Sequence, residues 1–374
     1  MCIFEPNLIL TEMNRFFNRI ALVSLAITLI CGQARAQFTT TYAKNASPGQ
    51  QTGLYYSLPQ TMLQLDFVIR ETVSEKGPLS DYADIYFADE DYVDYQTKSY
   101  ELLEVRMSSK AAPDPKATFF VNFVPVRGTK TCFDVLPNGI IKSVGSVGVK
   151  EEAPVNNVEG QEVYNEVHSA KLINDPGFMP LMTAGKTNSQ LAKEVADRIA
   201  EIRKSKFYLI SGDVEMASDP ETFKNMYAKM EEEEQQYLSL FLGKHTSREV
   251  VQTLFVVPTR EALTQTVAKF SDTEGLVTGA NGFGTSIVVQ TMPLNTTSII
   301  NAPSPSAVES MSYENKVMYR IPEMANVKVT YGNQTLIEAR QTINQLGVVV
   351  VAPVTNALLM FDTKTGQIIN MKMQ

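Results

Sequence analysis

The sequence predicts an α+β protein that is mainly antiparallel β, with two β-rich modules and a helical hairpin between them. Three observations support this fold class: many short runs in which apolar and polar residues alternate, turns containing glycine or proline between those runs, and two long amphipathic stretches near the middle of the chain. The 374 residues, of which 44% are hydrophobic and 20% charged, are typical of a globular chain of about two domains.

We expect five segments along the chain. They are a signal peptide over 1–36, a flexible leader over 37–52, a β-rich domain over 53–186, a helical hairpin over 187–245 and a second β-rich domain over 246–374. The alternation is clearest where Leu63, Leu65 and Phe67 share one face of a run and polar residues share the other. Strands are expected at 62–72, 100–107, 118–126, 139–149, 249–257, 286–292, 317–321, 327–331 and 347–351, and on both sides of the turn 363–366.

The N-terminus predicts a cleaved secretory signal peptide. A basic segment precedes the apolar run 20–30, and an Ala-x-Ala sequence ends at Ala36. The run is too short to cross a bilayer, which needs about 20 apolar residues, and no later run is long enough, so we expect no transmembrane helix. We predict that translation starts at Met1 or Met13 and that the signal peptide is cleaved after Ala36. The exported protein is then expected to be periplasmic or associated with the outer membrane. A lipoprotein acylated at Cys31 is the alternative.

Two amphipathic helices are predicted between the β-rich domains. Thr187 and Gln190 have the spacing of a capping box, in which each side chain binds the backbone N–H of the other residue. The apolar residues that follow at helical spacing are Leu191, Val195, Ile199 and Ile202. A second helix is expected to begin at Asp219-Pro220-Glu221 and to end at Gly243. We expect the two helices to pack against each other.

Two sequence patterns occur once in each β-rich domain. The runs 54–59 and 317–322 both end in proline and are both followed by an alternating strand. The turns 137–139 and 364–366 both place a glycine before a strand. These pairs are consistent with duplication of one β module, interrupted by the helical hairpin, and chance similarity between two β segments is the alternative.

Five sequence blocks resemble a known family. They are 53–59, 77–83, 139–144, 237–243 and 319–322. Through them the chain resembles a secreted family of gut Bacteroidetes that is described as domain of unknown function 4831, although it departs from the family pattern at Ala88 and at Ala352-Pro353. The resemblance implies an exported envelope protein without an assigned activity, and it supplies no catalytic residue.

The composition argues against several classes of function. The formal net charge of −8 disfavours nucleic acid as a partner, because phosphate recognition needs clustered Lys and Arg. His168 and His245 are the only histidines and lack the spacing of a zinc site, and no G-x-S-x-G nucleophile elbow is present. The glycine-rich run 275–284 lacks the lysine of a P-loop. Cys132, the single cysteine after cleavage, lies in a strand-like run where we expect a buried, inert thiol.

One acidic segment is the candidate site for a ligand or an ion. It interleaves carboxylates with tyrosines, and its acidic members are Asp84, Asp89, Glu90, Asp91 and Asp94. Carboxylate oxygens are typical Ca²⁺ ligands, and tyrosine rings can stack on sugars. A solvated acidic loop beside a short helix is the alternative. No cofactor is required by the sequence, and Ca²⁺ is the one ion that it indicates.

We therefore expect a non-enzymatic binding or assembly module of the cell envelope, whose partner is an envelope protein or a glycan. Two alternatives belong to other classes. A carboxylate-dependent glycan hydrolase would use two acids of the segment just described, whereas a self-associating structural subunit would use exposed edge strands. The oligomeric state is left open by the sequence.

Overall fold

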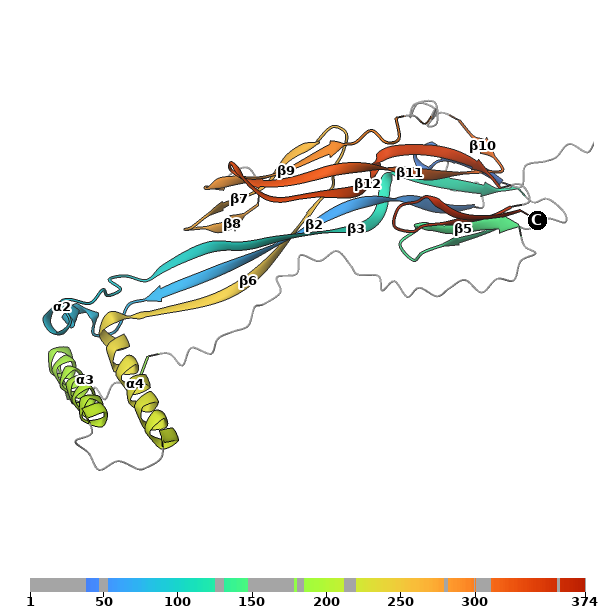
Figure 1. Cartoon of the computed structure of the whole chain (residues 1–374). Helices are drawn as coiled ribbons and strands as arrows, with labels where there is room; N and C mark the ends of the chain where they lie inside the picture. Colours follow the sequence, from blue (N-terminus) through green and yellow to red (C-terminus); the bar gives the residue numbers. More distant parts are fainter. Residues whose placement is uncertain are drawn as a thin grey trace, which may run out of the picture.

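The computed structural model describes residues 38–46, 53–124, 131–146, 178–179, 185–211, 220–278, 282–298, 300, 311–354 and 357–373. The predicted signal peptide, His168 and the helix start at Asp219 lie outside these residues. The described part of the chain is elongated, with a β body at one end and a pair of helices at the other (Figure 1).

Three sheets contain the strands, and neighbouring strands within each sheet are antiparallel, so the predicted fold class is confirmed. The first sheet has the order β10 (Tyr313–Glu314), β1 (Phe38–Tyr42), β3 (Thr97–Phe123), β2 (Gly53–Glu75) and β6 (Lys244–Val256). The second has the order β12 (Gln334–Pro353), β11 (Lys316–Tyr331), β9 (Thr285–Pro293), β7 (Thr264–Ser271) and β8 (Gly275–Val277). The third has the order β14 (Ile368–Met373), β13 (Ala357–Phe361), β5 (Ile141–Ser146) and β4 (Thr131–Val135).

The helices include the expected pair. They are the 3₁₀ turns η1 (Ala43–Asn45) and η2 (Ser80–Tyr82), the short α2 (Ala83–Tyr86), and the two long helices α3 (Asn188–Ser211) and α4 (Pro220–Leu242). Within the described ranges, no helix has the length and apolar character needed to cross a membrane. The first and third sheets take strands from both ranges expected as β-rich domains, 53–186 and 246–374, because β6 pairs with β2 and β13 pairs with β5.

Two strands each join segments that the alternation pattern predicts as separate strands. Residues 100–107 and 118–126 were expected as separate strands, as were 317–321 and 327–331, but β3 and β11 each run through without a break. A proline in each hairpin lies at a shift of register, between Ser57 and Pro59 in β2 and between Ile321 and Glu323 in β11. At each shift the strand that contains this proline leaves one residue out of the ladder and the facing strand leaves out four, 114–117 in β3 and 344–347 in β12, so the strands continue past the proline as an irregular ladder.

The buried apolar residues form three clusters. One lies around the starts of β2 and β11 and the end of β3 and includes strands of the third sheet, and another lies between the first and second sheets. Leu63, Leu65, Phe67 and Ile69 are buried in the second of these clusters, as their alternation predicted. The third cluster joins α3 and α4 to residues 79–87. Each part of the elongated chain therefore has its own core.

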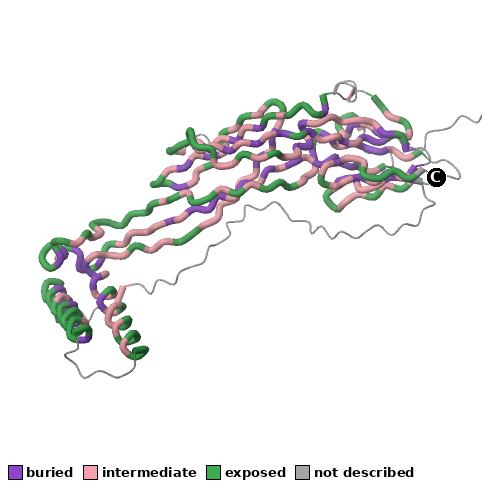
Figure 2. Tube along the Cα trace, in the orientation of Figure 1, coloured by how far each residue is buried: buried purple, intermediate pink, exposed green. Residues whose placement is uncertain are grey.

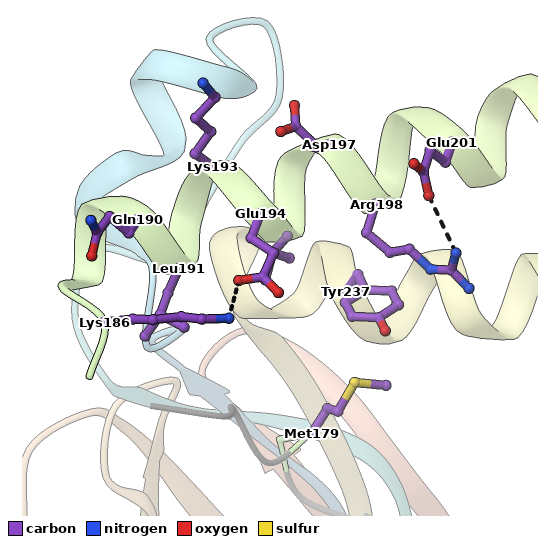
Figure 3. A pocket seen from close by; sticks show the side chains of 11 residues that line it. Met179, Lys186, Gln190, Leu191, Lys193, Glu194, Asp197, Arg198, Glu201 and Tyr237 are labelled. Carbon is purple, nitrogen blue, oxygen red and sulfur yellow. Dashed lines mark hydrogen bonds and ion pairs between the residues drawn. The ribbon is translucent and has the colours of Figure 1, made fainter. Parts of the chain in front are cut away.

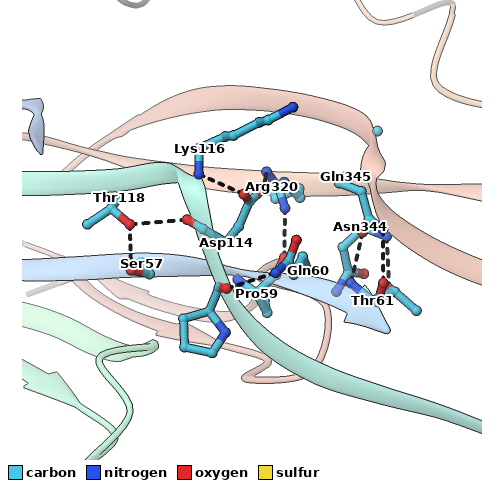
Figure 4. A network of polar contacts seen from close by, with 12 residues as sticks. Ser57, Pro59, Gln60, Thr61, Asp114, Lys116, Thr118, Arg320, Asn344 and Gln345 are labelled. Carbon is cyan, nitrogen blue, oxygen red and sulfur yellow. Dashed lines mark hydrogen bonds and ion pairs between the residues drawn. The ribbon is translucent and has the colours of Figure 1, made fainter. Parts of the chain in front are cut away.

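A buried ion pair ties the two long hairpins together where the prolines lie (Figure 4). Arg320 of β11 donates one hydrogen bond of 2.7 Å to Asp114 of β3 and another of 2.7 Å to the carbonyl of Pro59 in β2. Asp114 also accepts from the backbone N–H of Lys116 at 2.9 Å. Because both charges are paired and hydrogen-bonded, the cost of burying them is offset within the network.

The two halves of the body repeat each other. Repeat 1 consists of the long hairpin β2–β3 followed by the short hairpin β4–β5, and repeat 2 consists of β11–β12 followed by β13–β14. In each repeat the glycine of the short turn accepts a hydrogen bond from the first strand of the long hairpin: the backbone N–H of Ser57 in β2 donates to the carbonyl of Gly139 at 2.8 Å, and that of Arg320 in β11 donates to the carbonyl of Gly366 at 3.0 Å. The sequence runs 54–59 and 317–322 place Ser57 and Arg320 at corresponding positions.

The short hairpins correspond as well. In repeat 1 the pair Val135 and Ile141 lies next to a shift of register, and in repeat 2 the pair Phe361 and Ile368 lies next to the same kind of shift. Both turns also hold their glycine at positive φ, 86° at Gly139 and 78° at Gly366. The sequence similarity noted between the two β-rich domains is therefore accompanied by matching hydrogen bonds and matching bulges.

Candidate functional site

The candidate site is the group of helices at one end of the molecule, which we call the head. It consists of residues 76–96 together with α3 and α4, and it lies at the end of a ribbon of three strands, β3, β2 and β6, which we call the arm (Figure 1). The 13 residues of β6 give the arm a length of about 40 Å at ~3.3 Å per residue. The head lies at the end of this ribbon, beyond the part that packs against the second sheet, because the contacts with that sheet reach Ile69 and Tyr100.

The arm is stabilised near the head by charges. Glu71 of β2 is buried between Arg248 of β6, at 2.5 Å, and Lys98 of β3, at 3.4 Å. The hydrogen bond from Arg248 is the main reason why the pKa of Glu71 lies below its ordinary value, although burial opposes it. One carboxylate thus joins all three strands of the arm beyond the apolar stripe that ends at Ile69.

Local signals in the sequence set the ends of the helices. The backbone N–H of Thr187 donates to Gln190 Oε1 at 2.9 Å, and the N–H of Gln190 donates to Thr187 Oγ1 at 3.3 Å, so the predicted capping box is confirmed. At the other end of the hairpin Gly243 terminates α4 with φ 83°, and its N–H donates to the carbonyl of Ser239 at 2.9 Å. This region of φ favours glycine because it has no Cβ.

The loop that carries the acidic segment is bonded directly to the end of α4. Leu79 donates its N–H to the carbonyl of Leu240 at 2.8 Å, and Val93 donates to the carbonyl of Leu242 at 2.9 Å. The Phe87 and Phe241 rings meet at 5.0 Å between centroids in an edge-to-face arrangement. Residues 76–96 and the helices therefore form one packed unit.

An ionic network joins α3 to α4. Glu234 of α4 is buried and accepts hydrogen bonds from Arg203 at 2.6 Å and from Lys206 at 2.8 Å, and Lys206 also pairs with Glu231. Burial by itself raises the pKa of Glu234, but the two bonded cations outweigh it and the pKa is lowered. Arg203 extends the network to Glu90 at 3.3 Å. The acidic run Glu231–Glu234 is therefore part of the contact between the helices.

A groove of about 630 Å³ lies along α3 beside Met179 and Tyr237 (Figure 3). Its charged side chains are largely paired with one another: Lys186 pairs with Glu194, and Arg198 pairs with Glu201 at 3.3 Å. The described residues that line it include lysines, acids, an arginine and a tyrosine, so the groove offers charged and polar contacts for binding.

The structure places the five acidic candidates on the head without gathering them into one site. Asp84, on α2, accepts a hydrogen bond of 3.1 Å from the Tyr92 hydroxyl, which raises the pKa of Tyr92. Glu90 is the partner of Arg203. The remaining three, Asp89, Asp91 and Asp94, are exposed. Within the described part of the chain, no three His, Cys, Asp or Glu side chains form a group that could hold a metal ion.

The free end of the head exposes large apolar side chains that the sequence analysis did not single out. Phe207 is 66% exposed and Ile210 is 64% exposed, both near the end of α3 that points away from the arm, and Met226 is exposed near the start of α4 (Figures 1 and 2). The stripe from Leu191 to Ile202 continues at Leu209, which is buried. Phe207 lies off that stripe, which was the signal available in the sequence, whereas Ile210 lies close to the direction of Ile199 and its exposure was not recognisable from the spacing.

Two residues considered for chemistry lie away from the head core. Cys132 is exposed on β4, so the expectation of a buried thiol was wrong, because a strand of five residues has two faces and its sequence did not show which one is covered. His245 is the second residue of β6, and its Nδ1 lies 2.9 Å from the Ser74 hydroxyl. Ser74 and His245 are residue types of a nucleophile–base pair, but among the described residues no third side chain is hydrogen-bonded to the imidazole to orient it, and no histidine is bonded to Cys132.

Comparison with known proteins gives one match. The model of the family described as "Domain of unknown function (DUF4831)" matches residues 52–372, which include the arm, the head and both repeats. No curated protein and no solved structure matches the chain.

Proposed function

Since the chain belongs to the DUF4831 family, a description that assigns no activity, we propose from its geometry that it is a non-enzymatic binding or assembly module. The observation that carries the proposal is the head, which lies at the end of an arm of about 40 Å and exposes Phe207 and Ile210 at its far end. Exposed apolar groups in such a position are typical of surfaces that contact another protein.

The internal ionic network supports a head that keeps its shape on binding. Arg203, Lys206 and Glu234 connect α3 with α4, and Glu90 connects the acidic loop with both. A surface that is already ordered loses less conformational entropy when it binds a partner. The apolar end of the head is the part of this surface that gains most from burial.

The proposal includes the compartment and the partner. Because the N-terminal sequence has the pattern of a signal peptide, we propose that the chain is exported, is cleaved after Ala36 and meets an envelope protein or a glycan there. N-terminal sequencing of the protein purified from its native cells would give Gln37 as the first residue. A first residue within 1–30 would contradict this part of the proposal.

The binding role is tested by a paired substitution. The variant Phe207→Ser with Ile210→Ser removes the apolar end of the head, and we expect the protein to lose its chemically cross-linked partner in native cells. The matched control is Ile369→Ser with Met371→Ser, which removes two similarly exposed apolar side chains from β14 of the body. Equal loss in both variants, or no loss in either, would contradict a role for the head.

A further inference from the structure

The outer edge of β12 is open over a short and well-defined stretch. The second sheet ends at β12, and within the described ranges no strand pairs with its outer side. Before the stretch, Asn344 donates its N–H to Thr61, and Arg260 donates to the carbonyls of Leu346 and Gly347. After it, Pro353 has no N–H to offer. The open stretch is therefore 348–352.

Two hydrogen bonds establish which backbone groups point outward from this edge. Met318 and Arg320 of β11 donate their N–H groups to the Tyr56 hydroxyl and to the Gly366 carbonyl, away from β12. Their register partners on β12 are Val351 and Val349. In an antiparallel ladder, facing residues that do not bond each other direct their N–H and C=O groups to the outer sides. Val349 and Val351 thus present two donors and two acceptors.

The corresponding edge in repeat 1 is covered. There β1 pairs with β3 from Phe38 opposite Phe123 to Tyr42 opposite Phe119. Tyr56 lies opposite Phe119 in β2–β3, and its counterpart Tyr319 lies opposite Val350 in β11–β12, so 119–123 of β3 correspond to 350–354 of β12. The repeat therefore has a position for a strand that β1 fills on β3; on β12 this position overlaps the open stretch at 350–352, and no described strand fills it.

The residues of the open stretch are unusual for a free edge. They are four consecutive valines and an alanine, without charge. Edge strands of monomeric proteins are normally protected by charged residues, prolines or bulges, because an unprotected edge pairs with other chains. Here Arg260 and Pro353 limit the edge at its two ends and leave its centre accessible.

We propose that the β12 edge binds an extended, uncharged segment of a partner polypeptide, which adds to the second sheet as an antiparallel strand of about five residues. The partner segment resembles β1, Phe-Thr-Thr-Thr-Tyr, with large apolar residues at alternate positions, since β1 is the strand that the corresponding edge accepts. Main-chain hydrogen bonds supply the affinity in this mode, and alternate side chains supply the specificity. This surface is separate from the head and goes beyond the function proposed for it.

The probe is a labelled peptide with the sequence of residues 37–46, added to the full chain and followed by fluorescence anisotropy. In β1 the carbonyl of Phe38 accepts a hydrogen bond from Asn315, which follows β10 on the side away from β3. Because successive residues of a strand direct their backbone groups to opposite sides, Thr39 and Thr41 direct their N–H groups to β3. A peptide N-methylated at Thr39 and Thr41 loses the donors that would face β12, whereas one N-methylated at Thr40 keeps them. We expect the first to bind at least about tenfold more weakly than the unmodified peptide, and the second to bind nearly as well.

The site of binding is checked on the protein. Val350→Lys places a charge at the centre of the open edge, and we expect this substitution to abolish peptide binding. In a second experiment, a photo-reactive form of the peptide is bound to the unsubstituted chain, and we expect it to cross-link to residues within 334–353. Absence of binding, equal effects of the two methylation patterns, or cross-linking to β3 would overturn the proposal. Self-association of the chain that Val350→Lys abolishes would also overturn it, because the occupant would then be a second copy.

Discussion

Replacement of Arg320 by alanine is expected to cost the body a large part of its stability. The guanidinium is 5% exposed, its partner Asp114 is 6% exposed, and its two hydrogen bonds of 2.7 Å connect β11 with β3 and β2. Arg320→Ala leaves a buried carboxylate without its cation and the carbonyl of Pro59 without its donor. Breaking a buried pair in this way costs about 3–5 kcal/mol.

The matched control is Arg106→Ala, which breaks an arginine–carboxylate pair of 2.6 Å on the surface of β3, where Arg106 is 63% exposed and Glu104 is 52% exposed. An exposed pair contributes about 0–1 kcal/mol. Urea unfolding followed by circular dichroism should therefore show a much lower midpoint for Arg320→Ala than for Arg106→Ala. Equal midpoints would refute the reasoning that the buried pair holds the two hairpins together.

Three further outcomes are expected. Burial by itself raises the pKa of Glu323, but hydrogen bonds from Thr296 and Thr297 lower it to about 2. The loss of unfolding free energy caused by Glu323→Gln at neutral pH should therefore shrink as pH falls from 4.5 to about 2. A loss that stays constant over this pH range would contradict the prediction. Gly243→Ala should lower the melting temperature more than Gly139→Ala. Both glycines have positive φ, but only a Cβ at position 243 would clash with the backbone carbonyl of Glu75 in the arm. Equal decreases in melting temperature would contradict this clash. If the acidic segment binds calcium, as the sequence indicates, Ca²⁺ should raise the melting temperature of the unsubstituted chain and not of an Asp91→Asn variant, and no shift in either would contradict a calcium site in this segment.

Much of the fold was predictable because its signals are local. The alternation of Leu63, Leu65 and Phe67 gives the buried face of β2, and the spacing of Thr187 and Gln190 gives the start of α3. Gly243 marks the end of α4 for the same reason, since a backbone with φ 83° favours glycine. Each of these features depends on residues that lie within one turn or one strand.

The features that were not predicted depend on residues far apart in the chain. The pairing of β5 with β13 brings Val144 opposite Leu359, and no periodicity records which strands meet. The exposure of Cys132 likewise depends on which face of β4 another strand covers. The breaks expected within β3 and β11 were absent because bulges accommodate the prolines, and a bulge depends on the facing strand.

The candidate site was predicted only in part. The acidic segment does lie on the head, but Glu90 has a structural partner in Arg203, from α3. Of the exposed pair, only Phe207 was recognisable as an apolar residue off the helical stripe, and the position of Phe207 and Ile210 at the free end of the head required the structure.

Site-specific photo-cross-linking in native cells tests the central claim, that the head is a binding surface, most directly. A photo-reactive amino acid replaces Ile210 at the free end of the head or, as the control, Ser109, which is exposed on β3 of the arm. The account predicts a discrete covalent adduct with another envelope component from position 210 and none from position 109. The same adducts from both positions, or none from position 210, would contradict it.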